Sequence, residues 1–151
     1  MRNLLVALSL GLLIIGCSSS SKPGGMIRPE IEIEQSVGPG DVGYPRGIIE
    51  VQFAMKISNR SAQPVTLRRI EIQSVGGGGY TLRHETQVFN KTIEPDHFDT
   101  VKFWVRALAK GDTPAANEPV TIRGVAQFDS PAGSTQQFFL KNISQFSSGY
   151  R

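Results

Sequence analysis

The side chains that could support catalysis or metal binding are few and scattered along the sequence. His84 precedes Glu85. His97 follows Asp96, and Asp99 comes two residues later. A zinc site needs three or four such ligands together, with hydrogen-bonded support behind them. These residues could form one only if two distant parts of the chain folded together, so we expect both histidines on exposed strand ends or loops and no metal site.

Motifs for nucleophilic catalysis and phosphate binding are also missing. A catalytic serine needs a base beside it, and no serine of this chain lies in a Gly-x-Ser-x-Gly turn. The glycine run 76–79 lacks the Lys-Ser/Thr pair of a phosphate loop. Glu30, Glu32 and Glu34 alternate with isoleucines, which is typical of a solvated strand face. We predict that the protein is not an enzyme and has no cofactor; an enzyme with an unrecognised site is the alternative left open.

The charges are spread evenly. The 151 residues include 16 basic and 13 acidic side chains, for a net charge of +3. No basic run is longer than Arg68-Arg69, whereas nucleic-acid-binding proteins gather Lys and Arg on one face. We therefore predict no nucleic-acid partner.

The one cysteine of the chain ends an apolar N-terminal segment. Residues 4–15 are apolar except for Ser9 and Gly11, and Arg2 places a positive charge before them. The segment is shorter than the roughly 20 apolar residues that span a bilayer, and it suits the core of a signal peptide. Cys17 is the one cysteine of the chain and lies at the end of this segment. The mature domain therefore has no internal disulfide.

Residues 13–17, Leu-Ile-Ile-Gly-Cys, resemble the lipobox of bacterial lipoproteins. Ile14 is the aliphatic residue three positions before Cys17, and Gly16 is the small residue directly before it. Ile15 is bulkier than the residues usual at that position. The resemblance implies that residues 1–16 are a signal peptide cleaved after Gly16, and that Cys17 carries a diacylglyceryl group and a further acyl chain such as palmitate. Two or three acyl chains hold a protein stably on a membrane, whereas one holds it marginally.

The residues after the cysteine fit a lipid-anchored protein. Residues 17–27 include four serines and two glycines and predict a flexible, lipidated tether. By analogy with enterobacterial lipoprotein sorting, Ser18 favours the outer membrane. We expect the protein to be anchored in the bacterial envelope, at the outer membrane, facing the periplasm.

From residue 28 onward, apolar and polar residues alternate as in half-buried β-strands. The clearest run is 49–58, in which Phe53 and Met55 share a face. We expect further strands at 31–34, 65–73, 81–93 (one or two strands), 100–108, 120–128 and 134–143. No segment has convincing helical periodicity, and the stretches 59–64, 76–79 and 111–119 are expected to be loops.

Two local features refine this pattern. Val65 and Leu67 have one parity whereas Ile70 and Ile72 have the other, so a β-bulge near Arg68-Arg69 would bring all four to one face. Asp-Ser-Pro-Ala-Gly at 129–133 predicts a hairpin between the last two strands.

Together these features predict an all-β fold. About seven strands at short, regular spacing indicate a single antiparallel immunoglobulin-like β-sandwich over residues 28–145. A polar tail, 146–151, follows it.

The segment 51–65 is similar to small bacterial immunoglobulin-like modules and to the late-embryogenesis-abundant type 2, or water-stress, domain. An alternating strand ends in Ser58-Asn59, a short polar loop follows, and Pro64 precedes the next strand. Pro95 before the strand at 100–108 fits a later element of that domain. The chain has Asn59-Arg60 where that family tends to have Asn-Pro. The resemblance implies a seven-stranded sandwich without known catalysis.

Two aromatic residues are candidates for a binding surface. Trp104 has the parity opposite to Phe103 and lies between Lys102 and Arg106, so it could be an exposed binding residue flanked by cations. The alternative is that Trp104 covers the second face of its strand or packs under a loop. Phe139 is adjacent to another phenylalanine, and one of the two must lack cover. We predict a non-catalytic, lipid-anchored module that binds an envelope protein. A solute- or polysaccharide-binding lipoprotein is the alternative, and the oligomeric state stays open.

Overall fold

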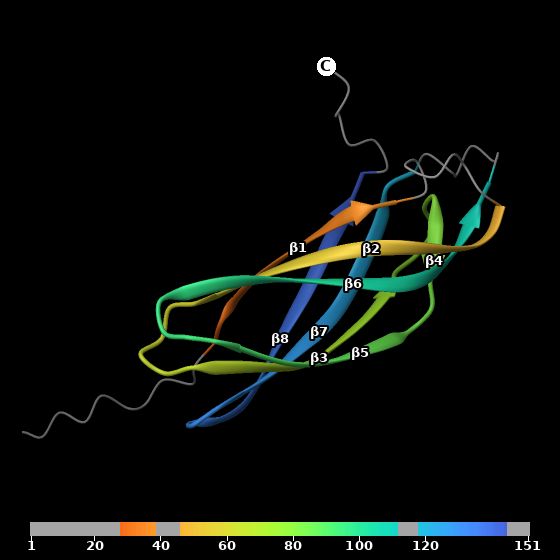
Figure 1. Cartoon of the computed structure of the whole chain (residues 1–151). Coiled ribbons are helices and arrows are strands. Elements are labelled where there is room, and N and C mark those ends of the chain that lie inside the picture. Colours follow the sequence, from red (N-terminus) through yellow and green to blue (C-terminus); the bar gives the residue numbers. More distant parts are fainter. Residues whose placement is uncertain (1–27, 39–45, 112–117, 145–151) are drawn as a thin grey trace, which may run out of the picture.

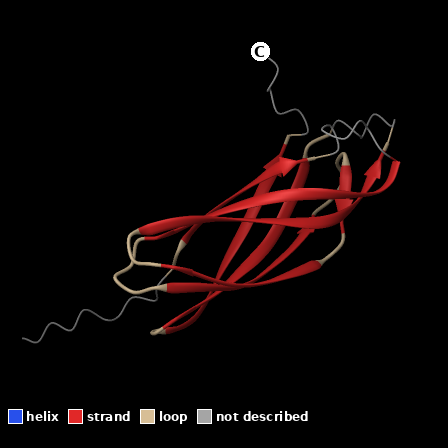
Figure 2. Cartoon of the chain, in the orientation of Figure 1, coloured by secondary structure: helices blue, strands red, loops and turns tan. Residues whose placement is uncertain are grey.

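The alternating stretches of the sequence form strands, because successive side chains of an extended chain point to opposite faces of a sheet. The computed structural model describes residues 28–38, 46–111 and 118–144, and within these ranges the regular structure is all strand (Figures 1 and 2). The strands are β1 (Glu30–Val37), β2 (Arg46–Asn59), β3 (Val65–Ser74), β4 (Tyr80–Leu82), β5 (Glu85–Ile93), β6 (His97–Lys110), β7 (Val120–Ser130) and β8 (Gly133–Ile143). These residues include no helix long and apolar enough to cross a membrane. The predicted signal peptide at 1–16, tether at 17–27 and tail at 146–151 lie outside the described residues.

The eight strands form two antiparallel sheets packed as two layers (Figure 1). The first sheet has the order β1-β2-β6-β4 and the second has the order β5-β3-β7-β8. Strands β1, β2 and β6 thus face β3, β7 and β8, which is how an immunoglobulin sandwich divides its strands. The prediction of a single antiparallel sandwich of this kind is confirmed. The expected stretch 81–93 is divided into β4 and β5, which join different sheets, and this accounts for eight strands instead of about seven.

The core consists of the inward-facing residues of both sheets. Val51, Phe53 and Met55 on β2 are fully buried. Phe53 lies directly opposite Phe103 on β6, with ring centroids 6.0 Å apart. Phe89 on β5 meets Phe103 edge-on at 5.9 Å, so the aromatic contacts join the two sheets. Burying one such side chain contributes roughly 1.5–3 kcal/mol, which explains how a domain without cysteine in its described residues is held together.

The β-bulge predicted near Arg68-Arg69 is confirmed. The register of β3 shifts between Leu67 and Arg69 against both of its neighbours, β5 and β7. The shift brings Leu67 and Ile70, which have different parity, to the same buried face. Arg68 becomes exposed and pairs with Asp129 through Nε, 2.7 Å from Oδ2.

The loop after β2 is organised by Asn59, a polar side chain that is only 1% exposed. Its Nδ2 donates to the carbonyl oxygens of Gln63 at 2.8 Å, Ile93 at 3.0 Å and Glu94 at 3.2 Å. Its Oδ1 accepts from the Ser61 backbone N–H at 3.0 Å and from the Ser61 hydroxyl at 2.7 Å. One amide thus ties the β2–β3 loop to the turn between β5 and β6.

The two ends of the sandwich differ in which connections they carry. Glu30 pairs with Ser58, and Asn59 pairs with His97, so the described chain begins beside the 60–64 loop and the 94–96 turn. The hairpin predicted at 129–133 joins β7 to β8 at this same end, which we call the entry end. The opposite end, which carries the starts of β2 and β7 and the ends of β6 and β8, is the far end.

Candidate interaction surfaces

Three large apolar side chains are exposed on the outer face of the first sheet. Ile48 on β2 lies directly opposite Leu108 on β6, and Trp104 lies four residues earlier on β6 on the same face. Their exposed fractions are 79% for Ile48, 55% for Leu108 and 46% for Trp104. We call these three residues the Trp104 surface. Trp104 is exposed as its parity predicts, while Ile48 and Leu108 join it near the far end.

Charged side chains border the Trp104 surface. Lys102 and Arg106 are exposed on the same face of β6, on either side of Trp104, as the sequence predicts. Arg106 lies opposite Glu50 on β2. The Arg106–Glu50 pair therefore lies between Trp104 and the Ile48–Leu108 pair. The surface mixes exposed apolar groups, tryptophan among them, with arginine, and these residue types are common in protein–protein contact sites.

Two side chains of β5 hold the strand that carries Trp104. Gln87 Nε2 donates to the Trp104 carbonyl oxygen at 3.0 Å, and Glu85 Oε1 accepts from the Arg106 backbone N–H at 3.2 Å. Strand β4 pairs only with residues 107–109 of β6, so these side chains satisfy backbone groups that no neighbouring strand reaches. The backbone under the Trp104 surface is therefore fixed.

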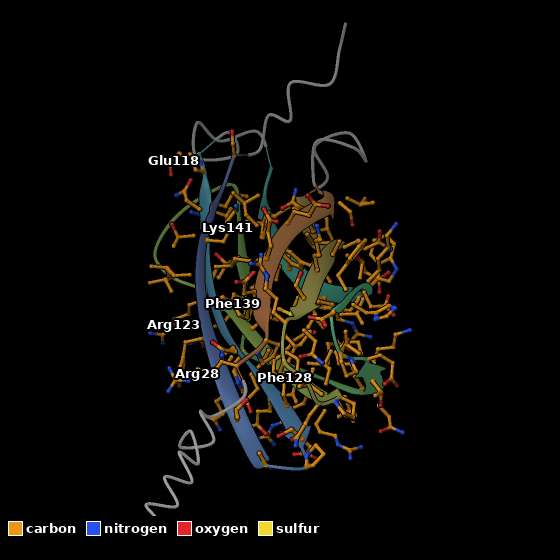
Figure 3. The ribbon with its side chains drawn as sticks, turned by 90° about the vertical axis from the view of Figure 1, so that its left-hand side faces the viewer. Arg28, Glu118, Arg123, Phe128, Phe139 and Lys141 are labelled. Atoms are coloured by element: carbon orange, nitrogen blue, oxygen red, sulfur yellow. The ribbon has the colours of Figure 1, made fainter. Side chains whose placement is uncertain are left out.

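The adjacent phenylalanines of β8 point to opposite faces. Phe139 packs against the core, and its ring covers Gly124 on β7. In Figure 3, Phe139 points toward the opposite sheet while Arg123 points away from it. Phe138 is 78% exposed and Leu140, on the same outer face, is 70% exposed. The aromatic residue without cover is therefore Phe138, whereas Phe139, which the sequence singled out, lies mostly inside.

The outer face of the second sheet holds an open cleft of about 410 Å³. It is lined by Glu71, Ile72, Gln73, His84, Arg123, Gly124, Val125, Phe138 and Phe139. With the Gln73 amide oriented so that its oxygen faces Arg123, both Nε and Nη2 of the arginine donate to that oxygen at 2.7 Å. Glu71 accepts from Arg69 at 3.0 Å and lies 3.5 Å from His84 Nε2.

The side chains that line this cleft can bind a ligand. The free donors of Arg123 and the apolar side of Phe138 suit a small anionic solute, which is the one feature that favours solute binding.

The residues considered for a metal site are far apart. His84 comes just after β4, in the half of the sandwich near the far end, whereas His97 is at the entry end. The Nδ1 atom of His97 lies 2.7 Å from the Pro95 carbonyl oxygen. Over the ranges that the structure describes, no group of three or more His, Cys, Asp or Glu side chains could hold a metal ion. Tyr80, Trp104 and Phe139 do not line a common pocket, because Tyr80 is fully buried and Trp104 lies on the other sheet from Phe139.

Two aspartates near the entry end have perturbed acidity. The pKa of Asp99 is lowered by a hydrogen bond from Lys91 Nζ at 2.6 Å and by the backbone N–H of Thr100 at 2.7 Å. The pKa of Asp129 is lowered by the Ser134 hydroxyl and then by Arg68. Both carboxylates are partly exposed and paired with cations on neighbouring strands, so they stabilise strand connections and are not poised for acid–base chemistry.

The fold and these surfaces define the chain as an all-β sandwich domain. No family model and no curated protein matches it. It is similar in structure to a Bordetella pertussis protein solved under the name ApaA, with a TM-score of 0.55 and 11% identity over 80% of this chain and 97% of the other. It is also similar to the Northeast Structural Genomics Consortium target SoR45, with a TM-score of 0.50 and 15% identity over 80% of this chain and 88% of that protein. At such identities the likeness shows the fold alone, and the resemblance to the water-stress domain stays a prediction.

Proposed function

We propose that the protein is a lipid-anchored envelope lipoprotein whose sandwich is a non-catalytic module that binds another envelope protein. The observation that carries the binding role is the Trp104 surface, in which three exposed apolar side chains share one outer face. Exposed apolar groups that share one face with charged side chains mark contact sites, because their removal from water favours association. The envelope location rests on the likeness of Gly16-Cys17 and the residues before it to a lipobox.

The position of the Trp104 surface suits a tethered domain. A lipid on Cys17 would be joined to the entry end by residues 17–27, which reach up to about 35–40 Å when extended. Ile48 and Leu108 lie near the opposite, far end. The contact surface would therefore face away from the anchoring membrane, toward proteins in the periplasm.

The decisive experiment is photocrosslinking in cells with the full chain. A photoreactive residue at Trp104 should crosslink to a protein of the envelope, and the same residue at Phe98 should not. Phe98 is the matched control because it is 68% exposed on the same face of β6 but lies at the entry end. Truncation of an interface tryptophan costs about 2 kcal/mol or more, so Trp104→Ala should weaken capture of that partner by at least about 30-fold. Equal crosslinking at both positions, or capture that Trp104→Ala leaves unchanged, refutes the proposal.

The anchor is tested separately. Cys17→Ala should release the chain from the membrane fraction, because no thiol would remain to carry lipid. If the variant stays in the membrane fraction as the wild type does, lipid on Cys17 is not the anchor.

Solute binding in the cleft is the second candidate, favoured by its volume and by Arg123. Pockets for small ligands usually have volumes of about 300–1,000 Å³. A short anionic oligosaccharide should then bind in equilibrium dialysis, and Arg123→Gln should abolish that binding. A neutral oligosaccharide is the control, and equal binding of both, or of neither, refutes this candidate.

A further inference from the structure

Each sheet edge of a sandwich exposes backbone N–H and C=O groups that can pair with another strand, and proteins usually block such edges. In the first sheet, β1 is blocked by its exposed glutamates, Glu30, Glu32 and Glu34, which would repel a like strand. Strand β4 is only three residues long. The stretch of β6 beyond β4 is capped by the side chains of Glu85 and Gln87.

The edge strand β5 of the second sheet is also protected. Its pairing with β3 is interrupted by the register shift between Leu67 and Arg69, where β5 passes from Lys91 to Val88. Lys91 is held by Asp99 of β6 at 2.6 Å. An irregular, charged edge of this kind pairs poorly with another strand.

Strand β8 has none of these protections. All eleven residues of Gly133–Ile143 pair with β7 in continuous register, without a bulge. The strand contains no proline, and Lys141 is its one charged residue. Its one hydrogen-bonded neighbour among the described strands is β7, although β1 runs beside it in the facing sheet (Figures 1 and 3). Phe138 and Leu140, 78% and 70% exposed, add apolar surface to this edge.

We propose that β8 pairs with β8 of a second copy of this chain, antiparallel and about a two-fold axis at Phe138. The two four-stranded sheets would then become one eight-stranded sheet. This inference goes beyond the proposed function, because the Trp104 surface lies on the other sheet and remains free in such a dimer.

The sequence of β8 is complementary to itself in this register. Phe138 meets its own equivalent, so these two exposed rings cover one another, and Leu140 lies opposite Gln136 of the second copy. Lys141 faces Thr135 of the second copy, and the two lysines are six positions apart along the strand, or about 20 Å. That separation exceeds the Debye length of about 8 Å at physiological ionic strength, so their repulsion is screened. A strand with glutamates at alternate positions, as in β1, would not be complementary to itself in this way.

Sedimentation analysis of the full chain in detergent tests the proposal. The wild type should sediment as a dimer. Phe138→Glu and Phe138→Lys should each weaken dimerisation by at least tenfold, because like charges then meet at the axis. A mixture of the two variants should form dimers again, because the charges that meet are opposite.

The matched control is Val88→Glu, since Val88 is 80% exposed on the other edge strand of the same sheet. It should dimerise as the wild type does, and all these variants should keep the wild-type circular dichroism spectrum because the replaced side chains are exposed. A monomeric wild type, a dimer that Phe138→Glu leaves intact, or failure of the mixed variants to associate overturns the inference.

The outcome is separable from that of the proposed function. Phe138→Glu should leave the crosslink at Trp104 unchanged, and Trp104→Ala should leave the dimer unchanged.

Discussion

Replacement of Asn59 should test most clearly how much its hydrogen bonds stabilise the entry end. In Asn59→Asp the shape is kept, but the Nδ2 donor that serves three carbonyl oxygens becomes a carboxylate oxygen that repels them. The hydrogen bond to Ile93 is fully buried, and an acceptor left unsatisfied there costs about 1–3 kcal/mol. The bonds to Gln63 and Glu94 are partly buried and contribute about 0.5–1.5 kcal/mol each.

The expected loss in Asn59→Ala is thus about 2–6 kcal/mol, a large part of the 5–15 kcal/mol by which domains are usually stable. Asn59→Asp should lose at least as much at neutral pH. Burial beside three carbonyl oxygens raises the pKa of the introduced carboxyl above its unfolded value. Its protonated form can donate one hydrogen bond, so the variant should recover stability as the pH falls and lose it again as the pH rises.

Urea unfolding followed by circular dichroism measures this effect. With a slope of about 1–3 kcal/mol per molar urea, a loss of 3 kcal/mol lowers the midpoint by roughly 1–3 M. Asn142→Asp is the matched control, because Asn142 is exposed and its side chain donates one hydrogen bond, to Thr121 Oγ1 at 3.1 Å. It should change stability by no more than about 0.5 kcal/mol. An unchanged midpoint for Asn59→Asp, or an equal loss for the control, would refute this account of the entry end.

Three further substitutions test other contacts. Gly124→Ala should destabilise the sandwich by about 1–3 kcal/mol in urea unfolding, because the new Cβ would lie 2.1 Å from a backbone oxygen of β3 and 2.3 Å from Phe139 Cζ. Thr135→Val should raise the melting temperature by roughly 3–6 °C, because it removes a buried hydroxyl that has no hydrogen-bond partner, a gain of about 1 kcal/mol. Asp99→Asn should flatten the acid limb of the melting temperature around and below the unfolded pKa of 3.8. The pKa of Asp99 is lowered in the folded state, first by Lys91, so this carboxylate supplies stability above the unfolded pKa that is lost as the pH falls through the folded pKa.

Each of these substitutions has a matched control. Gly77→Ala should be milder than the change at Gly124, because its Cβ would come no closer than 3.7 Å to a neighbour. Thr66→Val should give no gain, because Thr66 Oγ1 bonds to Thr92 Oγ1 at 2.9 Å. Lys91→Met should reproduce the flattened acid limb. Equal losses at the two glycines, equal gains at the two threonines, or an acid limb unchanged in the Lys91 variant would each contradict the corresponding reasoning.

Much of the fold could be predicted because its strands are half-buried and alternate strictly. The parity change across Arg68-Arg69 predicted the β-bulge, since only an extra residue could bring Leu67 and Ile70 to one face. The short strand Tyr80–Leu82 could not be separated from β5, because three residues are too few for alternation to show.

The candidate surfaces were only partly predictable. Parity places Trp104 and Leu108 on one face of β6, and the sequence therefore held a signal for the Trp104 surface. It could not bring Ile48 to Leu108, because that pairing joins strands distant in the chain. Nor could it choose between Phe138 and Phe139. The choice depends on the pairing of Phe139 with Gly124, where the missing side chain leaves room for the ring.

The pairing of β2 with β6 also bears on how the chain folds. Phe53 meets Phe103 across an intervening segment of 49 residues, whereas β7 and β8 are joined by a tight hairpin. Closing a flexible segment of that length costs about 3–4 kcal/mol of chain entropy before any contact offsets it. Hairpins form in about 1–10 μs, whereas sandwiches built on distant pairings fold in milliseconds to seconds. The first sheet therefore cannot be completed until β6 is available, and until then the apolar strand β2 remains open to wrong partners on that side.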